Sequence, residues 1–404
     1  MYYIIKMKVF ILLLTIILPF CLSLDNGLGL TPPLGWNSWN RYGCNITEDI
    51  IKTAANALIS TGLAKKGYNY VNIDDCWQIA RDANGRIVED KTAFPSGIKA
   101  LVDYVHSLGL KFGLYSSAGD KTCQGRPGGL NYEDIDAQTY TEWGIDYFKY
   151  DNCFNEGISG HVRYPKMRDA IAKAGGKIYY SVCSWGDEGI ATWGADVGNS
   201  WRTTGDIADN WLSFIGILDQ QQGLEVYAKP GAWNDPDMLE VGNGGMTTVE
   251  SQSHFALWAI LKAPLLIGCD LSTIKPEDLA ILKNDEVIAV NQDKMGIQAK
   301  RVVRLTTATG YLDTYAGTLK SNTIAIVMHN RSMFKQKMTV KFSDIGFEGA
   351  GGNIRDIINH VDYGFVYTQF EADVESHGVS FLTLHQYCLT DETEVESNKL
   401  KFLK

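Results

Sequence analysis

The chain has 404 residues, of which 45% are hydrophobic, and a formal net charge of -10 at pH 7. This hydrophobic share is sufficient for the core of one large domain and a smaller one. The acidic balance argues against nucleic acid or an anionic membrane surface as a partner and favours neutral substrates.

Residues 1–23 have the pattern of a secretory signal peptide. Lys6 and Lys8 precede the apolar run 9–22, and small residues at its end offer a cleavage site. Pro19 interrupts this run, which is short for the ~20 residues of a membrane-spanning helix, and no later stretch resembles one. We expect a mature protein that begins near Leu24, lacks a KDEL-type ending, and is secreted or lysosomal.

Seven cysteines follow this leader, and an oxidising compartment favours pairing of some of them. They are Cys44, Cys76, Cys123, Cys153, Cys183, Cys269 and Cys388. The odd count leaves at least one thiol free. Their spacing lacks the pattern of a zinc site, so we expect no metal and no cofactor. Asn45 and Asn330 begin glycosylation acceptor sequences, consistent with secretion.

From Leu34 to Asp270, short apolar strands that end in polar or aromatic residues alternate with helical stretches. The eight strand ends are Leu34–Trp36, Tyr70–Asp75, Phe112–Tyr115, Tyr147–Asp151, Ile178–Cys183, Ser200–Arg202, Ala232–Asp237 and Leu265–Asp270. The clearest helices are expected at Glu48–Thr61 after Thr47, at Ser96–Leu108 and at Thr248–Lys262 after Thr247. This alternation predicts an α/β fold with a (β/α)8 TIM barrel over residues 24–299. A doubly wound open sheet is the alternative, weakened because no Gly-x-Gly-x-x-Gly follows the first strand.

After Asp293 the pattern changes to strands separated by Gly, Asn and Asp turns. Residues 300–404 are therefore predicted to form a C-terminal antiparallel β-sandwich domain. The last dozen residues, rich in Glu, Lys and Asn, are expected to be a frayed tail.

Lys149 and Asp151 end an apolar, aromatic strand that begins after Gly144. Because they are two residues apart, they point to the same side of the strand, at the end where barrels keep their chemistry. A structural ion pair is the alternative. Other strand ends add further polar and aromatic residues, most of them carboxylates or aromatic rings: Trp36, Asp74, Asp75, Tyr115, Ser184, Trp185, Arg202, Asp206, Asp235 and Asp237.

This set contains no histidine and suits sugar recognition. Carboxylates accept paired hydrogen bonds from neighbouring hydroxyls, and aromatic faces pack against a pyranose. Each member has a simpler explanation: Asp74–Asp75 could bind a divalent cation, Arg202 with Asp206 could form a loop salt bridge, and Trp36 with Tyr115 could cap the barrel. The occurrence of all of them at successive strand ends favours a site.

Five motifs together resemble one enzyme family. They are Leu34-Gly-Trp-Asn-Ser-Trp39, Asp74-Asp-Cys-Trp77, Lys149-Tyr-Asp151, Asn199-Ser-Trp-Arg202 with Asp206, and Trp233-Asn-Asp-Pro-Asp-Met238. The chain is similar over its whole mature length to the clan D glycoside hydrolases of the α-galactosidase (melibiase) and α-N-acetylgalactosaminidase family. That family has a (β/α)8 barrel followed by an antiparallel β-domain.

The resemblance implies a role for each matching residue. Asp151 would be the nucleophile and Asp206 the general acid/base of a retaining exo-glycosidase that removes terminal α-galactose. Asp74 and Asp75 would bind the hydroxyls at positions 4 and 6, Lys149 those at 3 and 4, and Arg202 with Asp237 the hydroxyl at 2. Trp36 and Tyr115 would line the pocket. Cys123–Cys153 would be a disulfide in its wall, Cys44–Cys76 the other barrel disulfide, and Cys183 free.

The mechanism sets an electrostatic requirement for the two carboxyl groups. Asp151 must be ionised, which Lys149 favours, and Asp206 must hold a proton, for which we expect a raised pKa.

The resemblance implies that substrate preference depends on Ser184, because many α-galactosidases of the family have Glu at this position and the α-N-acetylgalactosaminidases have Ser there and Ala three positions on. This chain has Ser184 but Asp187, which matches the second pattern only by half. The small Ser184 would leave room for an N-acetyl group, whereas Asp187 would be a poor neighbour for its methyl and Trp185 could fill the space. We therefore favour α-galactosidase over α-N-acetylgalactosaminidase. A non-catalytic galactose-binding lectin and a metal-dependent isomerase are further alternatives, and a homodimer is left open. The expected partners are α-galactoside substrates, with no nucleic acid and no membrane span.

Overall fold

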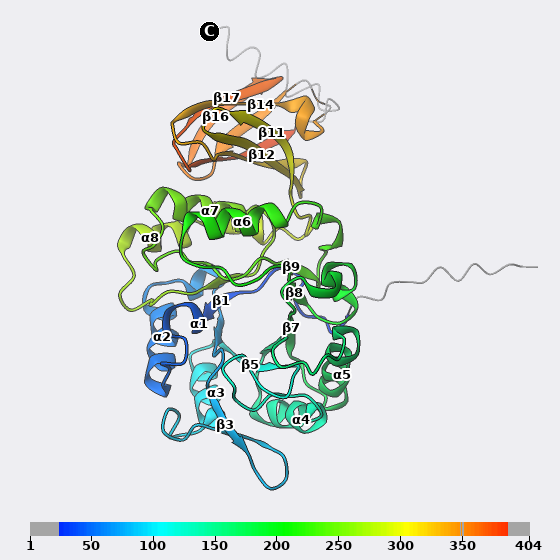
Figure 1. Ribbon diagram of the computed structural model, residues 1–404. Helices are drawn as coiled ribbons and strands as arrows, with labels where there is room; N and C mark the ends of the chain where they lie inside the picture. Colours follow the sequence, from blue (N-terminus) through cyan, green and yellow to red (C-terminus); the bar gives the residue numbers. More distant parts are fainter. Residues whose placement is uncertain (1–23, 348, 350, 387–404) are drawn as a thin grey trace, which may run out of the picture.

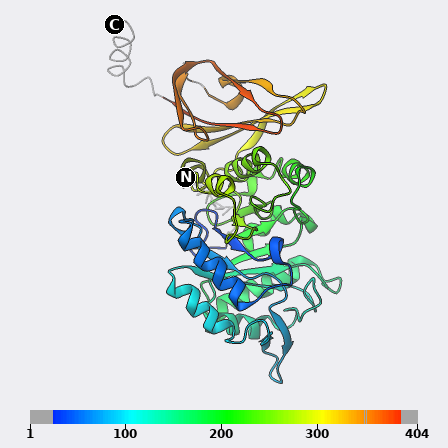
Figure 2. The ribbon, with the colours of Figure 1, turned by 90° about the vertical axis from the view of Figure 1, so that its left-hand side faces the viewer.

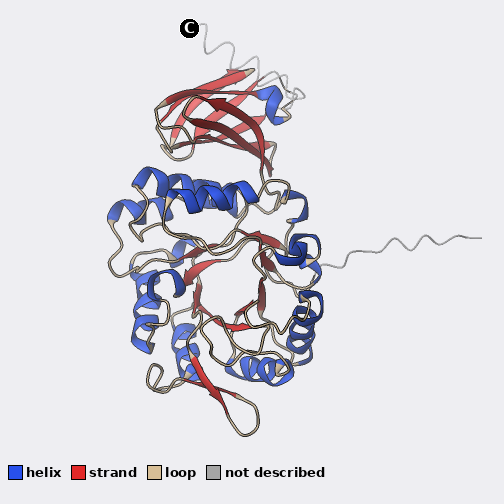
Figure 3. Ribbon diagram, viewed as in Figure 1, coloured by secondary structure: helices blue, strands red, loops and turns tan. Residues whose placement is uncertain are grey.

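The computed structural model describes residues 24–347, 349 and 351–386. Eight parallel strands form a ring surrounded by helices (Figure 1; Figure 3). The ring strands are β1 (Leu34–Asn37), β2 (Tyr70–Asn72), β5 (Lys111–Ser117), β6 (Tyr147–Asp151), β7 (Tyr179–Cys183), β8 (Ser200–Arg202), β9 (Trp233–Asp235) and β10 (Leu265–Ile267). The helices are α1 (Trp39–Tyr42), α2 (Glu48–Ser60), α3 (Ile98–Ser107), α4 (Glu133–Trp143), α5 (Gly160–Lys173), α6 (Trp211–Gln220), α7 (Thr248–Ile260), α8 (Pro276–Leu282) and α9 (Asp285–Asn291). The predicted barrel is confirmed, and the doubly wound alternative is wrong.

The ring closes between its first and last strands through a short bridge. The paired order runs β10-β1-β2-β5-β6-β7-β8-β9. Leu239, just after β9, forms a parallel bridge with Ile267 of β10. Its N–H donates to the carbonyl of Leu266 at 2.8 Å, and its carbonyl accepts from the N–H of Gly268 at 2.9 Å. The gap between β9 and β10 is therefore closed by the loop that follows β9, and not by direct pairing of the two strands.

Local sequence signals explain where the best-defined helices begin. The hydroxyl of Thr47 accepts the N–H of Ile50 at the start of α2, as expected for an N-cap. Thr247 and Glu250 form a reciprocal capping box at the start of α7. Helix α2 then buries an apolar face, whereas α7 is buried along nearly its whole length because the C-terminal domain also packs on it. These two helices fall within the predicted ranges, and α3 begins two residues later than expected.

A two-stranded hairpin after β2 was not anticipated from the sequence. It consists of β3 (Gln78–Arg81) and β4 (Ile87–Glu89), and it projects from the lower end of the view in Figure 1. Arg81 fixes it to the barrel, because its Nη1 lies 2.7 Å from Oδ1 of the fully buried Asp136 on α4. Strand periodicity cannot separate such an insertion from a ring strand.

The C-terminal region forms two antiparallel sheets. Six strands pair in the order β11 (Lys300–Thr307), β12 (Gly310–Leu319), β13 (Thr323–Asn330), β18 (Val379–Gln386), β15 (Gly351–Asp356) and β16 (Val361–Tyr367), and β14 (Gln336–Lys341) pairs with β17 (Gln369–Val374). Ile326, Met338 and Leu382 share a core between the two sheets. The opposite face of the larger sheet packs on the barrel, with Val327 and Phe381 in the barrel core (Figure 2). The domain limits at 24–299 and 300–404 stay predictions.

The structure argues against one predicted glycosylation site. Asn330 is fully buried, and its Nδ2, the atom that would carry the sugar, donates to the carbonyls of Phe334, Val374 and Glu375. A glycan on this nitrogen would require these hydrogen bonds to break and the sandwich to open. Asn45 is exposed, and its modification stays a prediction.

Two predicted segments lie outside the described residues: the signal peptide at 1–23 and the tail, which contains Cys388. Within the described part of the chain, none of the helices has both the length and the apolar composition needed to cross a membrane.

Candidate active site

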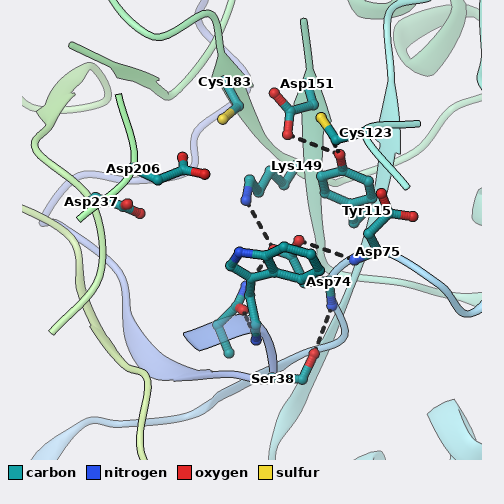
Figure 4. A network of polar contacts seen from close by, with 12 residues as sticks. Ser38, Asp74, Asp75, Tyr115, Cys123, Lys149, Asp151, Cys183, Asp206 and Asp237 are labelled. Carbon is teal, nitrogen blue, oxygen red and sulfur yellow. Dashed lines mark hydrogen bonds and ion pairs between the residues drawn. The ribbon is translucent and has the colours of Figure 1, made fainter. Parts of the chain in front are cut away.

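The carboxyl ends of the ring strands bring the predicted polar residues together. Tyr115 on β5 pairs in register with Lys149 on β6, and Asp151 pairs with Cys183 on β7. Arg202 on β8 pairs with Asp235 on β9. Since parallel strands in register align their side chains, these residues form a continuous row around one end of the barrel. Figure 4 shows Asp206 and Asp237 on one side of a shared space, Asp151 and Tyr115 on another, and Lys149 between them.

Lys149 forms a buried ion pair at the floor of this space. Its Nζ lies 2.9 Å from Oδ2 of Asp74, which is 2% exposed. Asn37 Nδ2 donates to the same oxygen at 3.1 Å, and the hydroxyl of Ser38 accepts the N–H of Asp74 at 3.0 Å. Burial opposes it, but Asp74 holds the pKa of Lys149 well above its usual value. The sequence reasoning missed Asn37 and Ser38, although both directly follow Trp36 at a strand end.

Asp151 is held in one orientation by two donors. The Tyr115 hydroxyl donates to its Oδ2 at 2.9 Å, and the N–H of Asn152 donates to its Oδ1 at 2.8 Å. Burial raises the pKa of Asp151 above its ordinary value, and Lys149 and these two donors oppose that rise. The carboxyl group therefore sits close to a cation, but in an environment that penalises its charge.

Arg202 connects the other two carboxylates. Its Nη2 lies 2.9 Å from Oδ1 of Asp206, and its Nη1 lies 3.0 Å from Oδ1 of Asp237. Asp237 is buried, and burial raises its pKa, whereas the side chain of Asp206 is 65% exposed. Partial desolvation opposes it, but Arg202 and Lys149 hold the pKa of Asp206 below its ordinary value.

The pKa directions therefore differ from the expectation for both members of the proposed catalytic pair. The pKa of Asp151 is raised because its burial outweighs Lys149, and the pKa of Asp206 is lowered because Arg202 reaches it across four residues.

Asp75 and the disulfides form the adjacent wall. Asp75 Oδ1 accepts the N–H of Cys76 at 2.6 Å, and its Oδ2 accepts the N–H of Gln124 at 3.0 Å. Cys44–Cys76 and Cys123–Cys153 are both disulfide bonds in the structure. The sulfurs of Cys123 and Cys153 lie with Asp151 in a group that could geometrically surround an ion, but disulfide sulfurs are not thiolate ligands. The oxygens of Asp75 are likewise occupied by N–H donors.

The remaining predicted residues occupy the floor and the rim. Trp36 is fully buried, with its indole N–H donating to the carbonyl of Cys269 at 2.8 Å, so its ring is not an exposed platform and direct sugar contact stays a prediction. Ser184 is buried at the end of β7, where its Oγ has no hydrogen-bond partner among the described residues. Trp185 is partly exposed at a φ of 62°. Cys183 and Cys269 are free buried thiols.

Comparison with known proteins identifies the family. A family model described as alpha galactosidase A matches residues 31–293, and another, described as the alpha galactosidase C-terminal beta sandwich domain, matches residues 309–384. The chain belongs to the α-galactosidase family. It is a glycoside hydrolase, as the sequence motifs indicated.

Individual relatives of this α-galactosidase-family chain agree over nearly its full length. α-Galactosidase 2 of Arabidopsis thaliana is 52% identical over 364 residues, covering 89% of this chain and 91% of the relative. An α-galactosidase of Cyamopsis tetragonoloba is 50% identical, with 89% and 87% covered. The crystal structure of α-galactosidase I from Mortierella vinacea has a TM-score of 0.86 at 40% identity, covering 89% of this chain and 98% of that one.

Proposed function

We propose that this chain is a retaining exo-α-galactosidase in which Asp151 is the nucleophile and Asp206 the general acid/base. The observation that carries the proposal is that these two carboxyl groups face one space from different sides, with Lys149 between them (Figure 4). A lectin needs no such pair. The similarity to the α-galactosidases of Arabidopsis thaliana and Cyamopsis tetragonoloba supports terminal α-galactose as the sugar.

The reaction would proceed in two displacements. Asp151 attacks the anomeric carbon while Asp206 gives its proton to the glycosidic oxygen, which leaves with the electron pair of the broken bond. A water molecule then attacks the same carbon, Asp206 takes the proton of this water, and Asp151 is released as a carboxylate. Tyr115 and the N–H of Asn152 keep the attacking carboxylate from rotating.

Arg202 would control when Asp206 carries its proton. In the structure the guanidinium holds the pKa of Asp206 low, which disfavours an acid. The guanidinium is also proposed to bind the hydroxyl at position 2 with Asp237. When the sugar engages Arg202 there, the hold on Asp206 weakens and its pKa rises. The basic limb of the kcat profile should therefore lie at higher pH than that of the kcat/KM profile, since the former reports the complex.

The other sugar contacts follow the buried carboxylates. Asp74 and Asp75 would accept from the hydroxyls at 4 and 6, and Lys149 would donate to those at 3 and 4. The Cys123–Cys153 disulfide would fix the wall beside the nucleophile. We also propose that the protein is secreted, on the basis of the predicted leader and of disulfides that require an oxidising compartment.

The test compares Asp151→Asn and Asp206→Asn on substrates with different leaving groups. Asp151→Asn should lose turnover of every α-galactoside, because an amide cannot form the glycosyl ester. Asp206→Asn should retain kcat/KM for release of dinitrophenol from its galactoside, because this step needs no proton donor, while losing hydrolysis of melibiose. Retention of wild-type rates by Asp151→Asn would overturn the assignment. EDTA should not change the wild-type rates; loss restored by a cation would favour a metal at Asp74 and Asp75.

A further inference from the structure

The loop that carries Asp206, residues 203–210, joins β8 to the N-terminus of α6. Next to β8, the N–H of Thr203 donates to the carbonyl of Asp235 at 3.0 Å. At its far end, Asn210 caps α6 by accepting the N–H of Ser213 at 3.0 Å. Gly205 and Asp206 are exposed between these ends. The acidic side chain thus extends from an exposed part of a loop that is bonded to the barrel at both ends.

Two hydrogen bonds join this loop to the loop after β9, and both are made by residues that follow Asp206 in the chain. The N–H of Ile207 donates to Oδ2 of Asp237 at 2.9 Å. Two residues further, Oδ2 of Asp209 accepts the N–H of Gly245 at 2.5 Å. The first contact belongs to the sugar site already described. The second uses a carboxylate that has no part in the reaction.

The approach at Gly245 is too close for any other residue. A Cβ at this position would lie 2.0 Å from the carbonyl oxygen of Asp209 and 2.7 Å from its Oδ2. Glycine is therefore required by contact with backbone rather than by an unusual φ. The two loops therefore meet closely, with the backbone of Gly245 directly against the backbone and carboxylate of Asp209, so a movement of one is transmitted to the other.

The loop after β9, which contains Asp237 and Gly245, is itself held in place by hydrogen bonds. The indole N–H of Trp258 donates to the carbonyl of Asp237 at 2.7 Å, and the capping box of Thr247 and Glu250 begins α7 directly after Gly245 and Met246. Helix α7 packs on the larger sheet of the C-terminal domain, where Ser253 Oγ donates to the carbonyl of His377 at 2.6 Å. Asp209 consequently ties the acid/base loop to the segment that leads into the capped and buried helix α7.

We infer that Asp209 is a positioning residue for catalysis, which holds Asp206 at the glycosidic oxygen through its contact with the N–H of Gly245. The inference rests on the proposed role of Asp206 as acid/base. A displacement of about 1 Å in a proton donor costs on the order of 100-fold in rate. Both uses of Asp206, as acid in the first displacement and as base in the second, are affected, whereas the attack of Asp151, on a different strand, is not; kcat/KM reports only the first displacement.

The experiment uses Asp209→Ala in the full-length protein with two substrates. On melibiose, whose leaving group needs protonation, kcat/KM should fall on the order of 30- to 100-fold. On 2,4-dinitrophenyl α-galactoside, which needs no acid, it should stay within about threefold of wild type. Asp209→Asn, which keeps an oxygen for Gly245, should restore most of the melibiose activity. Gly245→Ala should reproduce the selective loss if Asp209→Ala is poorly folded.

Asp219→Ala is the matched control, because it removes a carboxylate from the other end of α6 without touching the Asp206 loop. Asp219→Ala should change kcat/KM by the same factor on both substrates. An equal loss on both substrates for Asp209→Ala, or no loss, would overturn the inference. Asp206→Asn reports separately on the proposed function: if it shows no dependence on the leaving group, that role of Asp206 is wrong, whatever Asp209→Ala does.

Discussion

Two clusters of charged side chains in this molecule differ in the ratio of cations to carboxylates. Between the domains, three guanidiniums share two carboxylates, with contacts of 2.6 to 4.0 Å; the members of this interdomain network are Arg301, Arg304, Arg331, Asp219 and Asp313. At the barrel mouth two cations share many carboxylates. The members there are Lys149, Arg202, Asp74, Asp75, Asp151, Asp206, Asp235 and Asp237.

One carboxylate of each cluster has a pKa that follows this ratio, whereas for Asp206, at the exposed edge of the mouth, partial desolvation is outweighed by Arg202 and Lys149, which lower its pKa. Burial opposes it, but Arg331 and Arg304 lower the pKa of Asp219 to about 2. At the mouth, burial raises the pKa of Asp235 to about 6, and Arg202 opposes it only in part. Charges matched by partners stabilise a fold, whereas an excess of buried carboxylates costs stability and is found where chemistry requires it. The ratio separates the structural cluster from the functional one.

The largest expected effect comes from making the mouth still poorer in cations. Lys149→Met leaves the buried Asp74 without its ion-pair partner and removes the cation that favours ionised Asp151. Breaking a buried pair costs about 3–5 kcal/mol of folding stability. Separately, because Lys149 is also proposed to support ionised Asp151 and to bind the sugar, kcat/KM should fall on the order of 1000-fold, which corresponds to about 4 kcal/mol of transition-state stabilisation. The acidic limb of the pH profile should also move to higher pH.

Lys173→Met is its control, because the pair of Lys173 with Asp134 is exposed on both sides and should contribute almost nothing. If Lys149→Met kept activity within tenfold of wild type, the mouth would not depend on this cation.

The interdomain network should instead respond in stability. Asp219→Asn removes the carboxylate that contacts all three guanidiniums. Because its side chain is 38% exposed, solvent screening reduces the loss to about 1–2 kcal/mol of unfolding free energy. Urea unfolding should measure this loss, with kcat unchanged. Asp285→Asn, which breaks one exposed pair with Lys66, is the control; an equal loss there would remove the distinction.

The sequence predicted the ring of strands and the composition of the site for a definite reason. A strand buried on both faces is a continuous apolar run, so Lys149 and Asp151 marked where β6 ends. Residues at eight such ends must converge, and the motifs around Trp36, Asp74 and Arg202 supplied the family. The confirmed Thr47 and Thr247 caps followed from equally local signals.

What could not be predicted depends on which side chains meet. The sign of the Asp206 pKa shift is set by Arg202, which folds back on it, and the loss of Asn330 as an acceptor is set by carbonyls more than 40 residues away. The contact of Asp209 with Gly245 joins two loops across 36 residues. No periodicity or motif carries such information, because these contacts exist only once the loops are placed.

Acidification should change the contributions of the two clusters to the unfolding free energy in opposite directions: that of Asp235 rises and that of Asp219 falls. Asp235 has a folded pKa of about 6, above its ordinary value of 3.8, so its contribution to stability is present below pH 3.8 and is lost as pH rises through 6. Asp219, with a folded pKa of about 2, contributes stability above pH 3.8 that is lost only as pH falls through 2.

Between pH 7 and pH 5, the unfolding free energy of wild type relative to Asp235→Asn should therefore rise by about 1 kcal/mol. The same comparison with Asp219→Asn should stay constant over this range. Thermal or urea unfolding at the two pH values measures both differences. An unchanged Asp235 comparison would show that this carboxyl is ionised in the fold at no cost, and a fall on acidification would show that the fold favours its ionised form; either result would contradict the raised pKa of Asp235.

The smallest expected effect concerns substrate choice at Ser184, at the edge of the mouth. Its buried Oγ has no partner among the described residues, which suits a hydroxyl at position 2, and its small side chain also leaves room for an N-acetyl group. Asp187 lies close by, where its Oδ2 accepts a hydrogen bond from Nδ2 of Asn152 at 3.0 Å, and a carboxylate there is a poor neighbour for the acetyl methyl.

The lost transfer free energy of that methyl is at most about 1 kcal/mol, so α-galactoside should be preferred by no more than about fivefold in kcat/KM. Ser184→Glu fills the space and should depress the rate on α-N-acetylgalactosaminide more than on α-galactoside, with Ser184→Ala as the control that removes only the hydroxyl. Rates of the purified protein on the two nitrophenyl glycosides decide the matter, and a higher kcat/KM on the N-acetyl substrate would reverse the preference.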